Sequence, residues 1–298
     1  MTDNLEKIIQ ETSLKFIERY KARVGIGVKD LKSGKEYYIN GDIRFQPASV
    51  FKIFILSTLY DQAVKGNVDL DKMISIDDQE ISPGSGILRH FTGKYSFKIR
   101  DLAGLMMILS DNTATDLILN LVGKDNVNET IKRYGLHDSK VVYSCKELIF
   151  KALGTSDPRL LARRLKSRRP KIDLDFLRNY ETNNVTTPRD IVKILELLYY
   201  RKILTPVACN EIIDIMKRCQ TGEARMKRYL PPSVEVAHKT GTIAGIVNDA
   251  GIVFCGKRDF ILAIFLNEIP LRNGRYVAIG EDFIAKLSYK VYRAIISS

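Results

Sequence analysis

The chain has 298 residues, 45% of them hydrophobic and 28% charged, so it can bury a sizeable core and is not intrinsically disordered. Its formal net charge of +12 would suit an anionic partner such as nucleic acid, acidic lipid or a cell-wall polymer. The densest basic cluster, residues 163–171, contains no interleaved aromatic residues. This favours a solvated surface segment and argues against a nucleic-acid partner.

The sequence holds no run of eighteen apolar residues, and residues 1–16 lack the basic, apolar and small-residue order of a signal peptide. We therefore expect a soluble chain with no membrane span. The four cysteines show neither CxxC pairs nor metal-ligand spacing, and we expect free, mostly buried thiols. The three histidines are scattered, so neither a metal, nor another cofactor, nor a Ser-His-Asp triad is expected.

The predicted elements begin and end with amphipathic helices, over residues 4–20 and 281–296. Just inside the first helix, VGIGVKD and KEYYIN alternate around a Lys-Ser-Gly turn, which predicts a hairpin. Just inside the last, VEVAHKTGT, VNDAGIVF and DFILAIFL predict three more strands. We expect one antiparallel sheet made from both chain ends, with the terminal helices on one face.

The middle of the chain, residues 49–220, has helical periodicity in most of its segments. The predicted fold class is therefore α/β (α+β), and we expect a single domain. In this domain an all-helical lobe (about 49–220) is inserted into a sheet lobe (about 1–48 and 221–298). A site is expected between the two lobes.

The first candidate motif is Pro47-Ala48-Ser49-Val50-Phe51-Lys52, at the predicted start of a long helix. Three residues are nearly one helical turn, so Lys52 lies on the same face as Ser49 and its amine can reach the hydroxyl. A lysine whose pKa is lowered by burial can take the proton of a nucleophilic serine. Alone, the pattern favours a helix-capping serine followed by a surface lysine.

Two further motifs follow along the chain. Ser110-Asp111-Asn112 lies between two helical runs, on a turn whose hydroxyl and amide could serve a substrate, or which could be a simple helix cap. His238-Lys239-Thr240-Gly241-Thr242 ends a predicted strand, where the glycine would let a substrate approach the backbone. His238 is expected to flank the site or pack beneath it.

The order SxxK, SDN, KTG is a signature of class A β-lactamases and penicillin-binding proteins. The sequence resembles the class A β-lactamase family from about residue 20 to its end, in PASVFKIFIL, SDNTATDLIL, TTPRD and TGEARMKRYLP followed by AHKTGT. The resemblance implies a β-lactamase/transpeptidase-like fold and a serine hydrolase that opens β-lactam rings through an acyl-enzyme.

The resemblance also implies a role for each matching residue. Ser49 would be acylated, Lys52 would accept its proton and Ser110 would relay a proton. The substrate would be held by Asn112 at its side-chain amide and by Lys239, Thr240 and Gly241 near its carboxylate, supported by Arg225 unless that residue is a surface arginine. The backbone N–H groups of Ser49 and Thr242 would form the oxyanion hole.

The sequence departs from the family where class A enzymes carry an ExxLN motif, whose glutamate holds the deacylating water. Asp175, Glu181 and Asp173 are the candidate substitutes, and the absence of any such base is the further alternative. Without one, the acyl-enzyme would hydrolyse slowly.

We expect a monomer that binds a small-molecule β-lactam or a peptidoglycan-like peptide, and the resemblance suggests a periplasmic or secreted location. The alternatives are a D-alanyl peptidase or esterase that binds penicillin, and a non-catalytic β-lactam-binding module.

Overall fold

The computed structural model describes residues 2–167, 171–256, 258–271 and 274–297. The elements are α1 (Thr2–Tyr20), β1 (Arg23–Asp30), β2 (Glu36–Ile39), α2 (Lys52–Val64), β3 (Met73–Ile76), β4 (Tyr95–Lys98), α3 (Ile99–Ile108), α4 (Asn112–Val122), α5 (Lys124–Arg133), α6 (Cys145–Ala152), α7 (Pro158–Lys166), α8 (Leu174–Arg178), α9 (Pro188–Tyr199), α10 (Pro206–Lys217), β5 (Glu235–Ile243), β6 (Ile246–Phe254), β7 (Phe260–Asn267) and α11 (Tyr276–Ile296).

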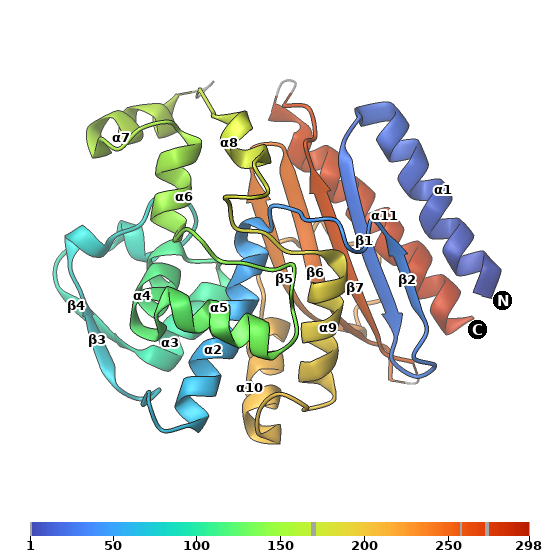
Figure 1. The fold of residues 1–298 in the computed structure, drawn as a ribbon, viewed down its shortest axis with the longest axis horizontal. Helices are drawn as coiled ribbons and strands as arrows, with labels where there is room; N and C mark the ends of the chain where they lie inside the picture. Colours follow the sequence, from blue (N-terminus) through green and yellow to red (C-terminus); the bar gives the residue numbers. More distant parts are fainter. Residues whose placement is uncertain (1, 168–170, 257, 272–273, 298) are drawn as a thin grey trace.

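Five strands form one antiparallel sheet in the order β2-β1-β7-β6-β5, so both ends of the chain contribute to it as predicted. The terminal helices α1 and α11 lie side by side over one face of this sheet (Figure 1). Their apolar stripes bury a core with the sheet residues beneath them. Gly280 permits this contact, because a Cβ there would lie 2.6 Å from Cβ of Val247.

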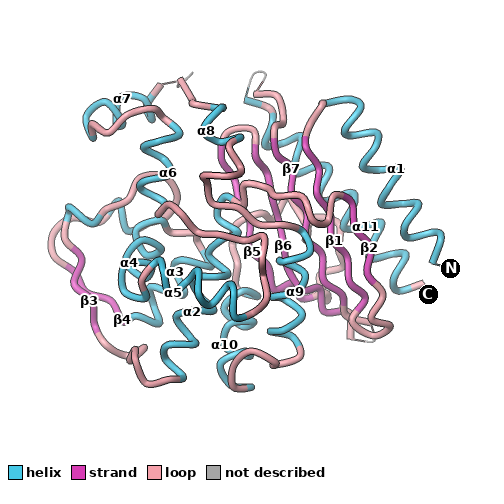
Figure 2. Tube along the Cα trace, viewed as in Figure 1, coloured by secondary structure: helices cyan, strands magenta, loops and turns pink. Residues whose placement is uncertain are grey.

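The opposite face of the sheet packs against α9 and the helices of the middle segment. Because this face and the face under α1 and α11 are both covered, β6 and β7 are buried along almost their whole length. Strand β5 is the edge strand that faces the helical part, and it packs against α10 and the 3-10 turn Ala48–Phe51 (Figure 2). The junction of sheet and helices is therefore built around β5.

The inserted lobe is not all-helical, because β3 and β4 pair as a two-stranded sheet within it. Each strand has only four residues, too few to produce a clear alternating pattern. The last helix, α11, begins at Tyr276, five residues before the predicted start at residue 281. Apart from these differences, the predicted antiparallel sheet with inserted helices is confirmed.

The remaining predictions from composition concern the thiols, the membrane and the basic cluster. All four cysteines are free, and only Cys255 is partly exposed. Among the described helices, none combines the length and the apolar character needed to cross a bilayer. Of the basic cluster, Arg163, Arg164 and Lys166 lie in the last turn of α7, whereas Arg168 and Arg169 fall outside the described residues.

Candidate active site

Ser49 lies in a 3-10 turn, Ala48–Phe51, that leads directly into α2. The helix does not start at Ser49 as predicted; the backbone N–H of Lys52 donates to the carbonyl oxygens of Ser49 and Val50 as the turn passes into α2. The Ser49 side chain caps neither element, and it is partly exposed. Lys52 is fully buried, so the reading of a capping serine followed by a surface lysine is wrong.

Two buried lysines meet at the hydroxyl of Ser110. Nζ of Lys52 lies 3.2 Å and Nζ of Lys239 lies 3.0 Å from Ser110 Oγ. Lys52 also donates to the Ser110 carbonyl oxygen at 2.8 Å and to Asn112 Oδ1 at 2.9 Å. Burial lowers the pKa of Lys52, and burial together with the neighbouring charges of Lys52 and Arg225 lowers the pKa of Lys239 to about 7. The cluster can therefore hold a neutral amine next to a hydroxyl near neutral pH.

The Ser110-Asp111-Asn112 turn joins α3 to α4, and its three side chains have two different roles. Asp111 caps α4 by accepting from the Ala114 N–H, and its other carboxylate oxygen binds the backbone N–H groups of Ile87 and Leu88. The capping interpretation is thus correct for Asp111, whereas Ser110 and Asn112 face the lysines. Ser110 has φ +55°, a left-handed conformation uncommon for serine, which presents both its carbonyl and its hydroxyl oxygen to Lys52.

Strand β5 carries the residues of the Lys-Thr-Gly motif on the edge of the sheet that faces the helices. Lys239 faces Ser110, whereas the Thr240 hydroxyl is 2.6 Å from the Thr221 hydroxyl, in the segment before β5. Arg225, in the same segment, donates to Thr242 Oγ1 at 2.6 Å and to the Gly241 and Asn248 carbonyl oxygens. It is only 4% exposed and also pairs with Glu281, so it is not a surface arginine.

Gly241 is required by the protein's own backbone. A Cβ at this position would lie 2.4 Å from the Pro47 carbonyl oxygen and 3.1 Å from the Ser49 backbone nitrogen. The sequence analysis expected a substrate to approach Gly241 closely, but the turn that carries Ser49 occupies that place. This packing brings the Ser49 N–H next to β5.

We predict that Gly241→Ala displaces the Ser49 turn from β5. The added methyl group meets backbone atoms that cannot rotate away, so we expect a loss of about 1–3 kcal/mol in the free energy of unfolding. Thermal unfolding measures the effect. Gly104→Ala, where the nearest atom would lie 3.9 Å away in α3, is the matched control and should not lower stability. A wild-type melting temperature for Gly241→Ala would contradict the prediction.

The three acidic candidates for a water-activating base all lie in or beside α8 and have exposed side chains. Asp173 caps α8, accepting from the Phe176 N–H at 2.8 Å. Glu181 pairs with Arg44 at 3.2 Å, and its side chain is 80% exposed. No hydrogen bond joins Asp173, Asp175 or Glu181 to Lys52, Ser110 or Lys239 within the part of the chain that the structure describes.

Two residues that the sequence analysis missed connect α8 to the Ser49 turn. The Gln46 side chain accepts from the Ala48 N–H and donates to Asn183 Oδ1 at 2.8 Å. Asn183 in turn donates to the Phe176 carbonyl oxygen in α8. The asparagine pair before TTPRD was the available sequence signal, although nothing in it indicates Gln46 as the partner.

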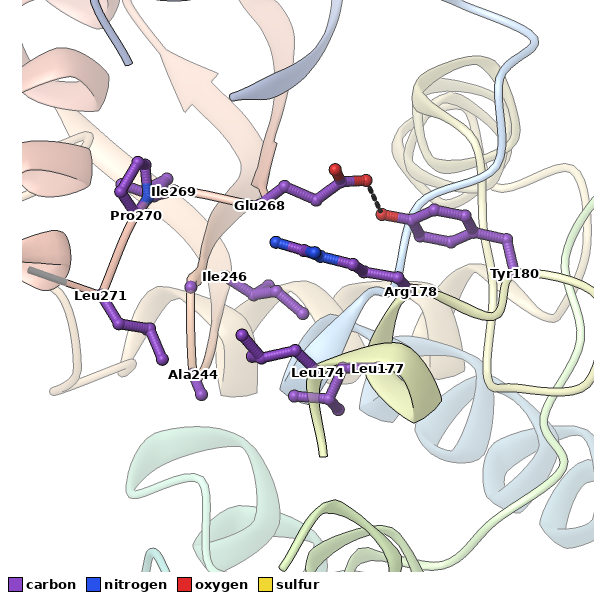
Figure 3. Close-up of a pocket in the computed structure, with 11 residues that line it drawn as sticks. Leu174, Leu177, Arg178, Tyr180, Ala244, Ile246, Glu268, Ile269, Pro270 and Leu271 are labelled. Carbon is purple, nitrogen blue, oxygen red and sulfur yellow. Dashed lines mark hydrogen bonds between the residues drawn. The ribbon is translucent and has the colours of Figure 1, made fainter. Parts of the chain in front are cut away.

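A cavity of about 160 Å³ lies between α8 and the turn that joins β5 to β6. Figure 3 shows Leu174 and Leu177 on one side of it and Glu268, held at 2.9 Å by the Tyr180 hydroxyl, on the other. The turn begins two residues after Thr242, so the cavity adjoins the end of the strand that carries Lys239.

The Ser49 turn, the Ser110 turn and the Lys-Thr-Gly strand meet at the junction of a helical lobe and an antiparallel sheet. This combination is typical of class A serine β-lactamases and penicillin-binding proteins. The chain belongs to the β-lactamase enzyme family, whose family model matches residues 4–295.

Individual relatives agree with the family. The chain is 26% identical to β-lactamase VEB-1 of Pseudomonas aeruginosa over 303 residues, covering 98% of this chain and 91% of VEB-1. A β-lactamase from Sphaerobacter thermophilus has the same fold, with a TM-score of 0.80 and 24% identity over 97% of both chains. PBP-A, solved as a mutant in an acyl-enzyme complex with penicillin-G, has a TM-score of 0.78 and 24% identity over 100% of this chain and 98% of PBP-A.

Proposed function

We propose that this member of the β-lactamase family opens β-lactam rings with Ser49 as the acylated nucleophile. The observation that carries the proposal is the buried Lys52–Ser110–Lys239 cluster, in which Lys52 begins α2 directly after the turn that carries the partly exposed Ser49. The relatives named β-lactamase, and the acyl-enzyme of PBP-A, support the same chemistry.

In the acylation step, the Ser49 oxygen attacks the ring carbonyl while its proton passes to Lys52. Lys52 suits this task because burial lowers its pKa, and because its hydrogen-bond acceptors are a hydroxyl, a carbonyl and an amide oxygen, not a carboxylate. The proton can then reach the departing ring nitrogen through Ser110, whose hydroxyl adjoins both lysines. The N–H groups of Ser49 and Thr242 would bind the developing oxyanion.

The substrate carboxylate would be held by Lys239 and Thr240, with Asn112 binding the side-chain amide. A carboxylate close to Lys239 favours its protonated form, which offsets the lowering of its pKa by burial. Arg225 acts from the other face of β5, where it fixes Thr242 and the Gly241 carbonyl and adds positive charge.

Release of the acyl group is the slow step in this proposal. The carboxylates of Asp173 and Glu181 are engaged away from the lysine cluster, and that of Asp175 is exposed, so none of these three acidic candidates is held where it would activate a water on the acyl-enzyme. The same arrangement fits a penicillin-binding D-alanyl peptidase or esterase, which is the second candidate.

Intact-mass spectrometry after addition of penicillin tests the proposal. We expect an adduct of one penicillin per chain that forms within minutes and decays slowly, and Asp175→Asn and Glu181→Gln should not lengthen its lifetime. A longer lifetime in either variant would identify that residue as the base. A permanent adduct, together with release of D-alanine from a peptidoglycan-like peptide, favours the second candidate. Absence of any adduct would exclude both. Sedimentation of the same samples tests the expected monomer.

A further inference from the structure

The terminal helices α1 and α11 form a groove between them, on the side of the sheet away from the helical lobe (Figure 1). Its volume of about 710 Å³ lies in the range of about 300–1,000 Å³ that is usual for small-molecule sites. Phe16 contacts Phe283 across the groove, with ring centroids 4.4 Å apart. Thr12, one turn earlier in α1, accepts from Lys290, nearly two turns later in α11, so the helices run antiparallel.

The floor of the groove is apolar. Phe16 packs against Phe283 and also against Tyr20, with ring centroids 4.8 Å apart. Ala278 and Ile279 continue this surface along α11. Phe16 and Phe283 are each only 6% exposed, so their rings lie below the rim. An apolar chain lying in the groove would remove this surface from water, whereas a flat or fully hydrated partner would leave it uncovered.

The rim of the groove is positively charged. Five basic residues and one acidic residue line it: Lys15, Arg19, Arg275, Lys286, Lys290 and Asp282. Asp282 is engaged by Lys286 at 2.7 Å. Among the described residues, no carboxylate pairs with the other four basic side chains, although Lys290 donates to the Thr12 hydroxyl. The groove therefore has positive charge that no described protein group neutralises.

This charge does not simply follow from the basic composition of the chain. A groove between α3 and α10 is lined by three acidic and two basic residues. Other exposed arginines are paired, as Arg189 is with Asp42 at 2.6 Å and Arg100 is with Asp71 at 2.8 Å. The combination of an apolar floor and unpaired cations is thus a property of the groove between α1 and α11.

We propose that this groove binds one molecule of a long-chain carboxylate, such as a free fatty acid, with its carboxylate at Arg19 and Arg275. The antiparallel helices place these two arginines at the same end of the groove, and a guanidinium binds a carboxylate through two parallel N–H···O bonds. The lining residues from Arg275 to Lys290 span about 22 Å of α11, at about 1.5 Å per residue, which leaves room for the extended chain. This inference does not depend on the proposed β-lactam chemistry.

Calorimetric titration with laurate, kept below its micelle concentration, tests the proposal on the whole protein. We expect one site per chain, and weaker binding when NaCl is raised from about 0.15 M to about 1 M, because salt screens the carboxylate from the arginines. Acetate has the same head without the chain, and dodecyltrimethylammonium has the same chain with a cationic head. Each should bind at least about tenfold more weakly than laurate, a difference of about 1.4 kcal/mol.

Two variants separate the head of the ligand from its chain. The double variant Arg19→Gln/Arg275→Gln removes the proposed carboxylate partners at two exposed positions, so the fold should be retained. Ala278→Glu places a carboxylate on an exposed part of the floor, where it would repel the ligand. We expect each to weaken laurate binding by about tenfold or more.

The matched control is Arg159→Gln/Arg163→Gln, which removes the same charge from exposed positions on α7. It should bind laurate as wild type does. Equal losses in the two double variants would show attraction to the net charge alone and would overturn the proposal. It is also overturned if laurate does not bind, or if acetate or dodecyltrimethylammonium binds as tightly.

A membrane surface is the other source of the same chemistry. Cosedimentation with vesicles of phosphatidylglycerol and phosphatidylcholine distinguishes it from a free molecule. Sedimentation that depends on Arg19 and Arg275, without binding of monomeric laurate, would assign the groove to an anionic bilayer and overturn the proposal.

Discussion

Replacing Ser49 with alanine is expected to abolish acylation by β-lactams. The variant loses the atom that we propose forms the covalent bond, and removal of a serine nucleophile lowers kcat by about 10³-fold to 10⁶-fold in enzymes of this kind. Ser49 is partly exposed and its side chain caps no helix, so stability should change little. Intact mass after penicillin addition and the rate of nitrocefin hydrolysis measure the effect.

The matched control is Ser75→Ala, which removes an exposed hydroxyl in β3 that is 2.9 Å from the Ser96 hydroxyl. This variant should form the penicillin adduct at the wild-type rate. An adduct of normal yield on Ser49→Ala, located by peptide mapping at another residue, would show that Ser49 is not the nucleophile.

Replacing Lys52 with methionine should slow acylation by about 10²-fold to 10⁴-fold, the usual contribution of a positioned general base. Methionine fills a similar volume, but it leaves the Ser110 and Asn112 oxygens without their shared donor. Some loss of stability is therefore expected as well. Stopped-flow acylation measures the rate, and thermal unfolding confirms that the variant is folded.

The pH dependence makes this test specific to a proton acceptor. Only the neutral amine can accept a proton, so wild-type acylation should fall as the pH drops through the lowered pKa of Lys52 and level off above it. The acylation rate of Lys52→Met should not show this fall at low pH. Lys65→Met, at the end of the same helix with a half-exposed side chain, is the control. It should keep both the wild-type acylation rate and its fall at low pH. An unchanged profile in Lys52→Met would contradict the role of Lys52.

The parts of the fold that were predicted correctly depend on local patterns. Alternation indicated β1, apolar runs of strand length indicated β5, β6 and β7, and helical periodicity indicated α1 and α9, because each element buries one or both faces along its length. The β3–β4 pair was missed because its strands have only four residues each and are separated by 18 residues.

The residues of the candidate site that belong to the three sequence motifs could be predicted. The residues that support those motifs from distant parts of the chain could not. The Ser49, Ser110 and Lys239 motifs come together as expected. No spacing rule links Gln46 to Asn183, 137 residues away, or Thr221 to Thr240. Arg225 was predicted to support the carboxylate site, but its contact to Glu281 depends on how α11 packs, and its contact to Thr242 depends on how the segment before β5 folds back onto that strand.

The contacts of Lys52 impose a limit on the direction of the Ser110 hydrogen. A protonated lysine has three N–H bonds, one for each of its three contacts, whereas a neutral one has two N–H bonds and a lone pair. The carbonyl and amide oxygens can only accept, so loss of one proton reverses the longest contact, to Ser110 Oγ. When both lysines donate, they occupy both lone pairs of that hydroxyl, and its hydrogen must point away from them. The charge on Lys52 thus sets the direction of the O–H bond of Ser110, which lies 58 residues further along the chain.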